Sequence, residues 1–243
     1  MRNPTAAILI IGDEILSGRT RDANMHYLAG ELTRIGIDLR EVRVVSDDHA
    51  AIVRAVNDLR AAHDHLFTSG GIGPTHDDIT ADAIAAAFAV PLAVRADARA
   101  VLQAYYDRAG VDMNEARLRM ARIPEGARLV DNPISAAPGF SLGNVHVMAG
   151  VPTIFQAMVA SLLPTLTGGK PLLSQSLRIM RGEGVIATPL AALAAEFADL
   201  SFGSYPFVDK GAYGTNLVVR GQDPARLDQA MIRMQAEFTE GTA

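Results

Sequence analysis

Apolar runs alternate with helical patterns through the first ninety residues of the chain. Residues 6–11 form an unbroken apolar run, which is typical of a strand buried on both faces of a parallel sheet. Two further strands are expected at residues 39–45 and 65–69. Segments with apolar residues at helical spacing follow the three strands, at residues 22–36, 48–59 and 79–89. This order predicts a right-handed, doubly wound parallel sheet.

The pattern changes in the second half of the chain. Residues 97–122 are expected to be helical throughout, with a break near Gly110. Residues 141–149 predict two strands joined by a Gly-Asn turn, and Pro152 opens a further helix. The Thr-Gly-Gly-Lys-Pro stretch at 167–171 reads as a linker. We therefore expect an α/β domain over residues 1–169 and a second domain over residues 170–243.

The second domain is expected to be a small α+β module. Its predicted order is strand, helix, strand, strand, helix, at residues 174–180, 187–198, 201–208, 215–220 and 224–238. Five elements in about 70 residues are enough for a compact satellite domain with its own core.

Composition excludes several classes of function. Hydrophobic residues make up 49% of the 243 residues and charged residues 20%, as in globular proteins. The net charge of −5 and the lack of a basic run argue against nucleic acid as the partner. The absence of cysteine excludes disulfides, thiolate catalysis and Cys-based metal sites. No apolar run approaches about 20 residues and no signal peptide is evident, so a cytoplasmic location away from membranes is expected.

A glycine-rich loop carries the most specific chemical signal. Gly70, Gly71 and Gly73 lie between an expected strand and an expected helix, where bare backbone N–H groups can approach a phosphate. Asp77 and Asp78 follow at once, and carboxylates repel phosphate unless a divalent cation lies between them. The loop therefore predicts a phosphate held by both backbone amides and a metal ion.

Acidic residues follow all three early strands. They occur at Asp13-Glu14, Asp47-Asp48 and Asp77-Asp78, and ligands of parallel sheets lie beyond the carboxyl ends of the strands. Each pair also has an alternative explanation. The second and third pairs could cap the helices that follow them, and the first could simply be solvated. Their combination with the glycine loop favours a binding site.

The loop sequence resembles a known family. Gly-Gly-Ile-Gly-Pro-Thr-His-Asp-Asp-Ile-Thr at 70–80 is similar to the signature of the molybdopterin-binding fold of the MogA, MoaB and MoeA proteins and of the CinA group (competence/damage-inducible protein A). Further matches are spread over almost the entire chain, at residues 11–18, 24, 27–29, 45–48, 132–133, 137–140, 150–152 and 203–206. The nicotinamide-nucleotide amidase domain of full-length CinA proteins has no counterpart, so that activity is not expected.

The resemblance implies a fold, a ligand class and a set of site residues. The fold is a three-layer α/β/α domain with a mostly parallel sheet, and the ligand is molybdopterin or another phosphorylated pterin or nucleotide, bound with Mg²⁺ or another divalent cation. A homo-oligomer, either dimer or trimer, is expected. Asp47 and Asp78 match catalytic positions. The implied metal ligands are Asp78, Asp47, Glu14 and Asp77, and the implied phosphate-binding residues are Gly70, Gly71, Gly73, Ser69, Thr75 and Ser17.

Departures from the family pattern leave the activity open. Ser135-Ala136 replaces Gly-Thr, Ala149 replaces a proline, and Ile154 replaces an acid. Intact acid pairs favour metal-dependent hydrolysis of a phosphoanhydride, as in ADP-ribose or a dinucleotide. The lost groups favour a binding module without chemistry. Adenylyl transfer in molybdenum cofactor biosynthesis is a further alternative.

Overall fold

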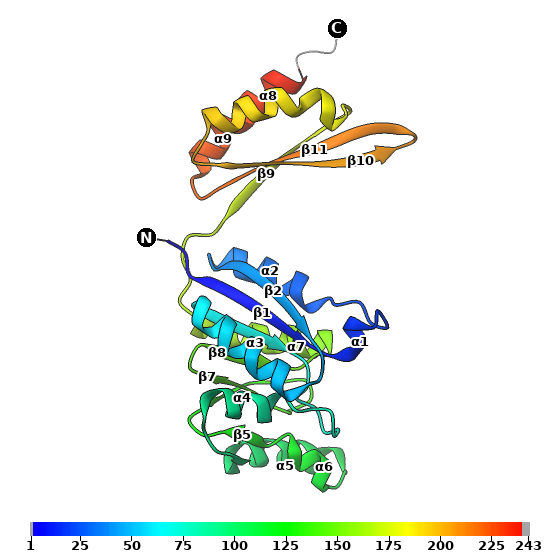
Figure 1. The fold of residues 1–243 in the computed structure, drawn as a ribbon, viewed down its shortest axis with the longest axis vertical. Helices are drawn as coiled ribbons and strands as arrows, with labels where there is room; N and C mark the ends of the chain where they lie inside the picture. Colours follow the sequence, from blue (N-terminus) through cyan, green and yellow to red (C-terminus); the bar gives the residue numbers. More distant parts are fainter. Residues whose placement is uncertain (1, 240–243) are drawn as a thin grey trace. The chain divides into compact units, whose positions relative to one another are not determined.

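Two compact units make up the chain. The structure, a computed structural model, describes residues 2–239 (Figure 1). The first unit spans Met1–Gly169 and the second spans Lys170–Ala243. No helix within residues 2–239 is long and apolar enough to cross a membrane.

The first unit is built on a six-stranded, mostly parallel sheet. Its strands are β1 (Thr5–Ile11), β2 (Asp38–Val45), β3 (His65–Ser69), β6 (Arg128–Val130), β7 (Gly139–Leu142) and β8 (Val145–Met148). Their order in the sheet is β2-β1-β3-β8-β7-β6, in which β2, β1, β3 and β8 are parallel and β7 is antiparallel to both of its neighbours. The parallel sheet and the antiparallel pair at the Gly143-Asn144 turn are as the sequence predicts.

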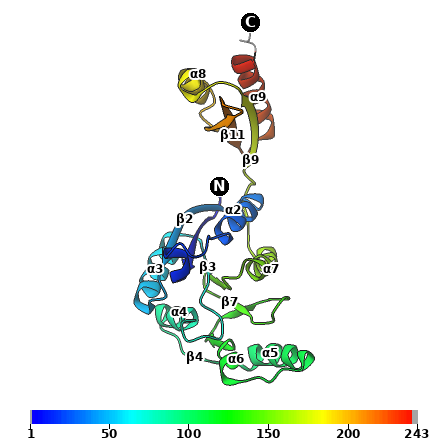
Figure 2. The same cartoon turned by 90° about the vertical axis from the view of Figure 1, so that its right-hand side faces the viewer.

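Helices cover both faces of this sheet. The helices of the first unit are α1 (Asp13–Leu16), α2 (Asn24–Arg34), α3 (His49–Ala62), α4 (Thr80–Phe88), α5 (Ala96–Ala109), α6 (Glu115–Arg119) and α7 (Pro152–Leu162), with a 3₁₀ turn at Leu163–Thr165. Figure 2 shows α3 and α4 on one side of the strands and α2 and α7 on the other. The expected three-layer α/β/α architecture is confirmed.

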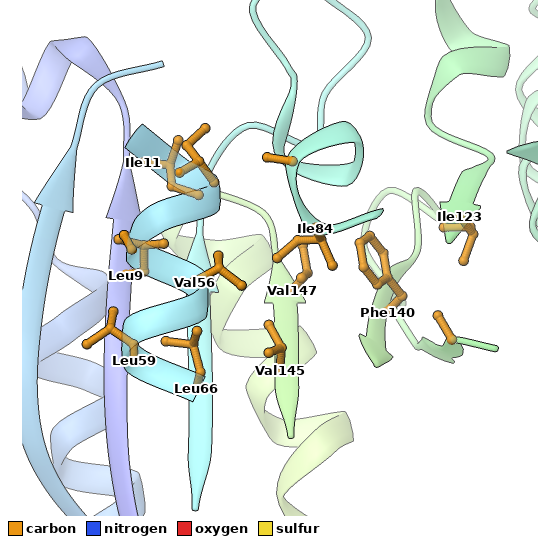
Figure 3. Packing of buried hydrophobic residues seen from close by; sticks show 14 of the residues in the cluster. Leu9, Ile11, Val56, Leu59, Leu66, Ile84, Ile123, Phe140, Val145 and Val147 are labelled. Carbon is orange, nitrogen blue, oxygen red and sulfur yellow. The ribbon is translucent and has the colours of Figure 1, made fainter. Parts of the chain in front are cut away.

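The strand β1 contributes to both hydrophobic cores by alternation. Its residues Ala7, Leu9 and Ile11 belong to the core on the side of α3 and α4, together with Val56 and Leu59 (Figure 3). The intervening residues of β1, at positions 6, 8 and 10, pack with α2 and α7 on the opposite face. Because all six side chains are at most 4% exposed, the apolar run at 6–11 is explained by burial on two faces.

The segment 97–122 differs from its expected form. It was expected to be helical with a break near Gly110, and α5 does end there, since Gly110 has a left-handed φ of 65°. The interruption is longer than expected, because α6 begins only at Glu115. The end of the segment is a strand, β5 (Arg122–Pro124), which pairs antiparallel with β4 (Leu92–Val94). Glycine at the left-handed C-cap stops the first helix, and three-residue strands are too short to show a period in sequence.

The second unit is a three-stranded sheet with two helices. Its elements are β9 (Leu173–Ile179), α8 (Glu183–Glu196), β10 (Ser201–Asp209), β11 (Ala212–Gly221) and α9 (Pro224–Thr239), and the sheet order is β10-β11-β9. Both pairings are antiparallel. Apolar side chains of α8 and α9 bury Leu217 and Val219 of the central strand. This is the expected small α+β module.

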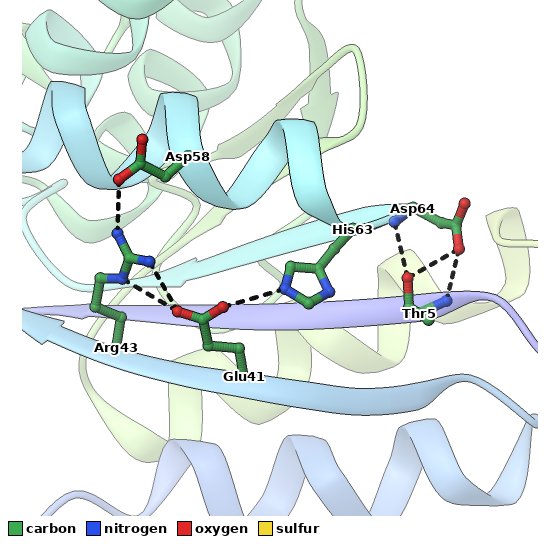
Figure 4. Close-up of polar contacts among 6 residues, drawn as sticks. All are labelled: Thr5, Glu41, Arg43, Asp58, His63 and Asp64. Atoms are coloured by element: carbon green, nitrogen blue, oxygen red, sulfur yellow. Dashed lines mark hydrogen bonds and ion pairs between the residues drawn. The ribbon is translucent and has the colours of Figure 1, made fainter.

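A polar network ties β2 to the C-terminal half of α3 (Figure 4). Arg43 of β2 contacts Asp58 at 3.0 Å and Glu41 at 2.8 Å, and Glu41 also lies 3.4 Å from His63. Hydrogen bonds from Arg43 and then His63 lower the pKa of Glu41. The network is partly exposed, so its main effect is to fix the orientation of α3 rather than to add much stability.

A buried imidazole makes polar contacts with two neighbouring strands of the six-stranded sheet. His146 of β8 is 3% exposed, with Nδ1 2.9 Å from the Ser141 hydroxyl and Nε2 3.2 Å from Nδ1 of His65. Burial, followed by repulsion from His65, lowers the pKa of His146 to about 3. The side chain is therefore neutral at physiological pH and serves as a polar link between three strands.

This imidazole predicts a loss of stability in acid. The unfolded chain binds a proton at His146 below about pH 6.5, whereas the folded chain does so only near pH 3, so the free energy of unfolding falls between these values. The slope from one such group approaches about 1.4 kcal/mol per pH unit. Urea unfolding at pH 7, 6, 5 and 4 should show a shallower acid slope for His146→Gln. Parallel slopes for variant and wild type would contradict this assignment.

Candidate functional site

The main cavity of the first unit lies beyond the carboxyl ends of β1, β2 and β3. Its volume is about 560 Å³, which is the size of a nucleotide-type pocket. Ile11 and Gly12 line it after β1, Asp47 after β2, and Gly70 and Gly71 after β3. The three segments that the sequence places at one sheet edge therefore meet at one space.

The first two glycines allow very close packing of the backbone. The Gly70 N–H donates to the carbonyl of Met148 at 3.1 Å, and a Cβ on Gly70 would overlap the Ile11 carbonyl. Gly71 has a φ of 68°, and a Cβ there would overlap the Thr80 hydroxyl. Thr80 fastens the loop by donating its hydroxyl to the Gly70 carbonyl at 2.9 Å and its N–H to the Gly71 carbonyl at 3.0 Å. Only glycine fits both positions.

The third glycine admits a carboxylate. A Cβ on Gly73 would lie 2.6 Å from Oδ2 of Asp78, so the missing side chain lets Asp78 rest against the loop. Asp78 accepts hydrogen bonds from the N–H of Thr75, at 2.8 Å, and from its hydroxyl. The N-cap of α4 is Ile79, without a side-chain cap. Neither Asp77 nor Asp78 therefore caps that helix, and both line the cavity.

The second acid pair divides two roles between adjacent residues. Asp48 is the N-cap of α3 and accepts the Ala51 N–H at 2.7 Å. Asp47 instead lines the cavity and accepts the Asp13 N–H at 3.0 Å. Burial raises the pKa of Asp47, and the charges of Asp13, Glu14 and Asp77 raise it further, against the effect of that backbone hydrogen bond. Asp47 thus lies in a crowded field of negative charge.

Four carboxylates face the cavity without forming a closed cluster. Besides Asp47, Asp77 and Asp78, Glu14 of α1 lines the wall and lies against Gly12, where a Cβ would overlap its carboxylate. Within residues 2–239, no three His, Cys, Asp or Glu side chains converge as a ready metal site. The donors are the hard oxygens that Mg²⁺ prefers, and a cation would relieve the repulsion around Asp47. The residues fit a divalent cation in chemistry, with side-chain movement needed to gather them.

Three of the expected phosphate-binding residues are not on the cavity wall. Ser69 is buried and accepts a hydrogen bond from the Asn24 amide at 2.8 Å. Thr75 bonds Asp78, and Ser17 is the C-cap of α1. These side chains support the loops around the cavity rather than face it, so direct ligand contact by them stays a prediction.

The remaining wall comes from residues that no sequence motif marks as phosphate or metal ligands. Thr20, Met120 and Asn132 line it, as do Ser135 and Ile154 at two positions that depart from the family pattern. Asn132 orders its own loop by donating to the Ser135 hydroxyl at 2.7 Å. Met120 follows α6 and has no local sequence motif that would assign it. Apolar side chains on this side of the cavity suit the ring system of a ligand rather than its phosphates.

Comparison with known proteins places the chain in a family. Residues 7–168 match the family described as probable molybdopterin binding domain. The chain belongs to the molybdopterin-binding domain family. Residues 171–243 match the family described as FAD synthase, middle domain.

Relatives of two kinds are similar in sequence to this chain. The chain is 30% identical to a protein of Caenorhabditis elegans named "Probable FAD synthase", over 95% of the chain and 49% of that protein. It is 36% identical to a "CinA-like protein" of Citrifermentans bemidjiense, over 67% of the chain and 40% of the relative. The chain thus spans half or less of the length of these two relatives.

A solved structure shows the same fold for the first unit. The CinA protein of Thermoplasma acidophilum, whose crystal structure is described as that of a protein with unknown function, is 32% identical. The likeness covers 67% of this chain and 97% of that one, with a TM-score of 0.62. The resemblance to CinA-like molybdopterin-binding proteins is therefore confirmed, and it fixes the fold rather than the reaction.

The raised pKa of Asp47 predicts that replacing its carboxylate by an uncharged side chain makes the folded protein more stable. A carboxyl whose pKa is higher in the folded state destabilises the fold once the pH rises through both values, so Asp47→Asn should melt at a higher temperature than wild type at pH 7. The gain should vanish below the ordinary aspartate pKa. Calorimetry with and without Mg²⁺ should also show a magnesium-induced shift for wild type that the variant lacks.

Asp48→Ala is the matched control. Loss of the α3 cap should cost about 1 kcal/mol but leave the magnesium-induced shift in place. A variant Asp47→Asn that is less stable than wild type at pH 7 would contradict the raised pKa of Asp47, and a variant that keeps the full magnesium shift would refute the assignment of Asp47 to a cation site.

Proposed function

We propose that the cavity binds a phosphorylated nucleotide or pterin with a divalent cation, and that the protein hydrolyses a phosphoanhydride bond. The observation that carries the proposal is that the glycine loop and four carboxylates face the same cavity. Backbone amides alone suffice for phosphate binding, and carboxylates alone oppose it. The acids therefore serve a purpose beyond holding an anion, and cation binding is the purpose that makes them compatible with phosphate.

In this proposal the loop and the acids have separate tasks. The N–H groups of Gly71 and Gly73 seat the phosphate and stabilise the charge that develops on it during hydrolysis. Asp78 is held in one orientation by Thr75 and contributes an oxygen to the cation. Asp47, which lines the cavity at the end of β2, contributes a second oxygen, and the cation would relieve the repulsion among the neighbouring carboxylates.

Glu14 and Asp77 complete the oxygen donors available to the cation. Glu14 belongs to the short helix α1, and Asp77 directly precedes Asp78 in the loop. A bound divalent cation would supply charge neutralisation of the phosphates and a more acidic water. The apolar wall that includes Met120 and Ile154 would hold the ring system of the ligand.

Binding without chemistry is the second candidate. It is favoured by Ile154, which lies on the cavity wall where the family pattern has an acid. The carboxylates of residues 2–239 also do not converge as a ready metal site. Adenylyl transfer would use the same phosphate seat, with a phosphate of a second substrate in place of water as the acceptor.

Incubation with compounds that contain a pyrophosphate tests the hydrolytic proposal. FAD belongs in the panel because of the relatives named "Probable FAD synthase", together with ADP-ribose and NAD. With Mg²⁺ or Mn²⁺, wild type should release AMP from at least one of them, as measured by chromatography. Asp47→Asn combined with Asp78→Asn should lower the rate at least about 100-fold, as expected for loss of two ligands of the cation that activates the water.

The N-cap residue Asp48 provides the control for this experiment. Asp48→Ala, which affects only the helix cap, should keep its turnover. Metal-dependent binding without AMP from any compound would overturn the hydrolytic proposal in favour of the binding module. AMP release that persists in the double variant would exclude these two acids from the chemistry.

A further inference from the structure

A second recess adjoins the main cavity behind the glycine loop. Gly71, Gly73 and Asp78 line both spaces. The far wall of the recess carries two cations, Arg119 and Arg122, which come from the end of α6 and from β5. Cationic side chains therefore lie beside the proposed phosphate seat.

One of the two arginines is already neutralised. Arg122 forms a two-point ion pair with Asp82 of α4, with nitrogen–oxygen distances of 2.6 and 3.1 Å. In this pairing both terminal nitrogens of the guanidinium donate to the same carboxylate. Arg122 therefore fixes the position of β5 against α4 and has little charge to offer a ligand.

The other arginine is not committed in this way. The Nε atom of Arg119 is buried and has no hydrogen-bond partner among residues 2–239. A buried N–H without an acceptor is unfavourable by about 1–3 kcal/mol, which makes such groups rare unless a ligand completes them. Arg117, two residues earlier on the same helix, is by contrast engaged with the ring of Tyr106 and the carbonyl of Asp112.

Charge balance explains what Arg119 would bind. Glu14, Asp47, Asp77 and Asp78 line the main cavity, and no lysine or arginine is among the described residues that line it. A single divalent cation offsets two of these four charges and leaves nothing for a second phosphate of the ligand. Arg119 is the neighbouring cation that can supply this charge, because it lines the recess beside the loop and a guanidinium pairs well with phosphate oxygens.

We infer that Arg119 binds the second phosphate of a nucleoside diphosphate group whose first phosphate is seated on the glycine loop. This inference rests on the proposed function, because it assumes that the loop holds the first phosphate. It assigns Arg119 to recognition of the diphosphate unit, so the site prefers diphosphates to monophosphates. The recess is narrow, which restricts its occupant to a phosphate oxygen rather than a ring.

Titration calorimetry with AMP and ADP in the presence of Mg²⁺ tests this preference, with ADP supplied as its α,β-methylene analogue, whose P–C bonds the proposed hydrolysis cannot cleave. Wild type should bind ADP more tightly than AMP. Arg119→Gln should weaken ADP binding at least about tenfold while changing AMP binding less than about threefold, since a charge-assisted contact to the second phosphate alone is lost. Arg119→Lys keeps the positive charge but lacks the planar guanidinium, so its affinity for ADP should lie between those of wild type and Arg119→Gln. Arg99→Gln, an exposed arginine of α5, should behave as wild type.

The same titrations distinguish a failure of the Arg119 assignment from a failure of the proposed function. Equal loss of AMP and ADP affinity in Arg119→Gln would show a general effect on the site and overturn the inference. An unchanged preference for ADP would overturn it as well, while leaving the proposed function in place. Wild type that binds neither nucleotide would overturn both. Melting temperatures of the variants, measured in parallel, establish that each is folded.

Discussion

The close approach of backbone at the ends of β1, β3 and β8 is the constraint on which the site depends. Gly70 bonds the carbonyl of Met148, lies against the carbonyl of Ile11 and has Cα 3.2 Å from the position of a Cβ on Gly150. Any side chain at Gly70 would separate these strand ends. Because the strands end together, the loops that follow them project their acids into one space rather than into solvent.

The same arrangement concentrates negative charge, and this has a cost in stability. Asp47 is partly buried among other carboxylates, which raises its pKa, whereas the neighbouring Asp48 performs an ordinary structural task at the start of α3. A fold selected for stability alone would have no reason to keep Asp47 charged. Functional sites commonly retain such unfavourable groups because a ligand compensates for them.

Much of the fold could be predicted from the sequence because burial of a strand or helix fixes the spacing of its apolar residues. The apolar run at 6–11 alternates between two cores, and the Gly143-Asn144 turn joins the two strands expected around it. The strands β4, β5 and β6 and the helix α1 were missed because three or four residues do not establish a period. The break near Gly110 was expected, but residues 111–114 and the start of the strand at 122–124 were assigned to helix.

The candidate site was predictable only in part. Local sequence identified the glycine loop and the acid pairs, but N-cap preference could not tell Asp47 from Asp48, since both are adjacent aspartates before a helix. Arg119 and Met120 reach the loop through the tertiary packing of α6 and β5, and no local motif marks them. Residues that meet through packing alone leave no signal in a single sequence.

The most direct test of the proposed cation and phosphate sites is a crystal structure of the protein with Mn²⁺ and ADP, with the metal located by its anomalous scattering. We expect a Mn²⁺ peak bonded to Asp47 and to at least one of Glu14, Asp77 and Asp78, with a phosphate within hydrogen-bond distance of the Gly71 and Gly73 N–H groups. A cation bound elsewhere, or a nucleotide whose phosphates lie outside the glycine loop, would contradict this proposal.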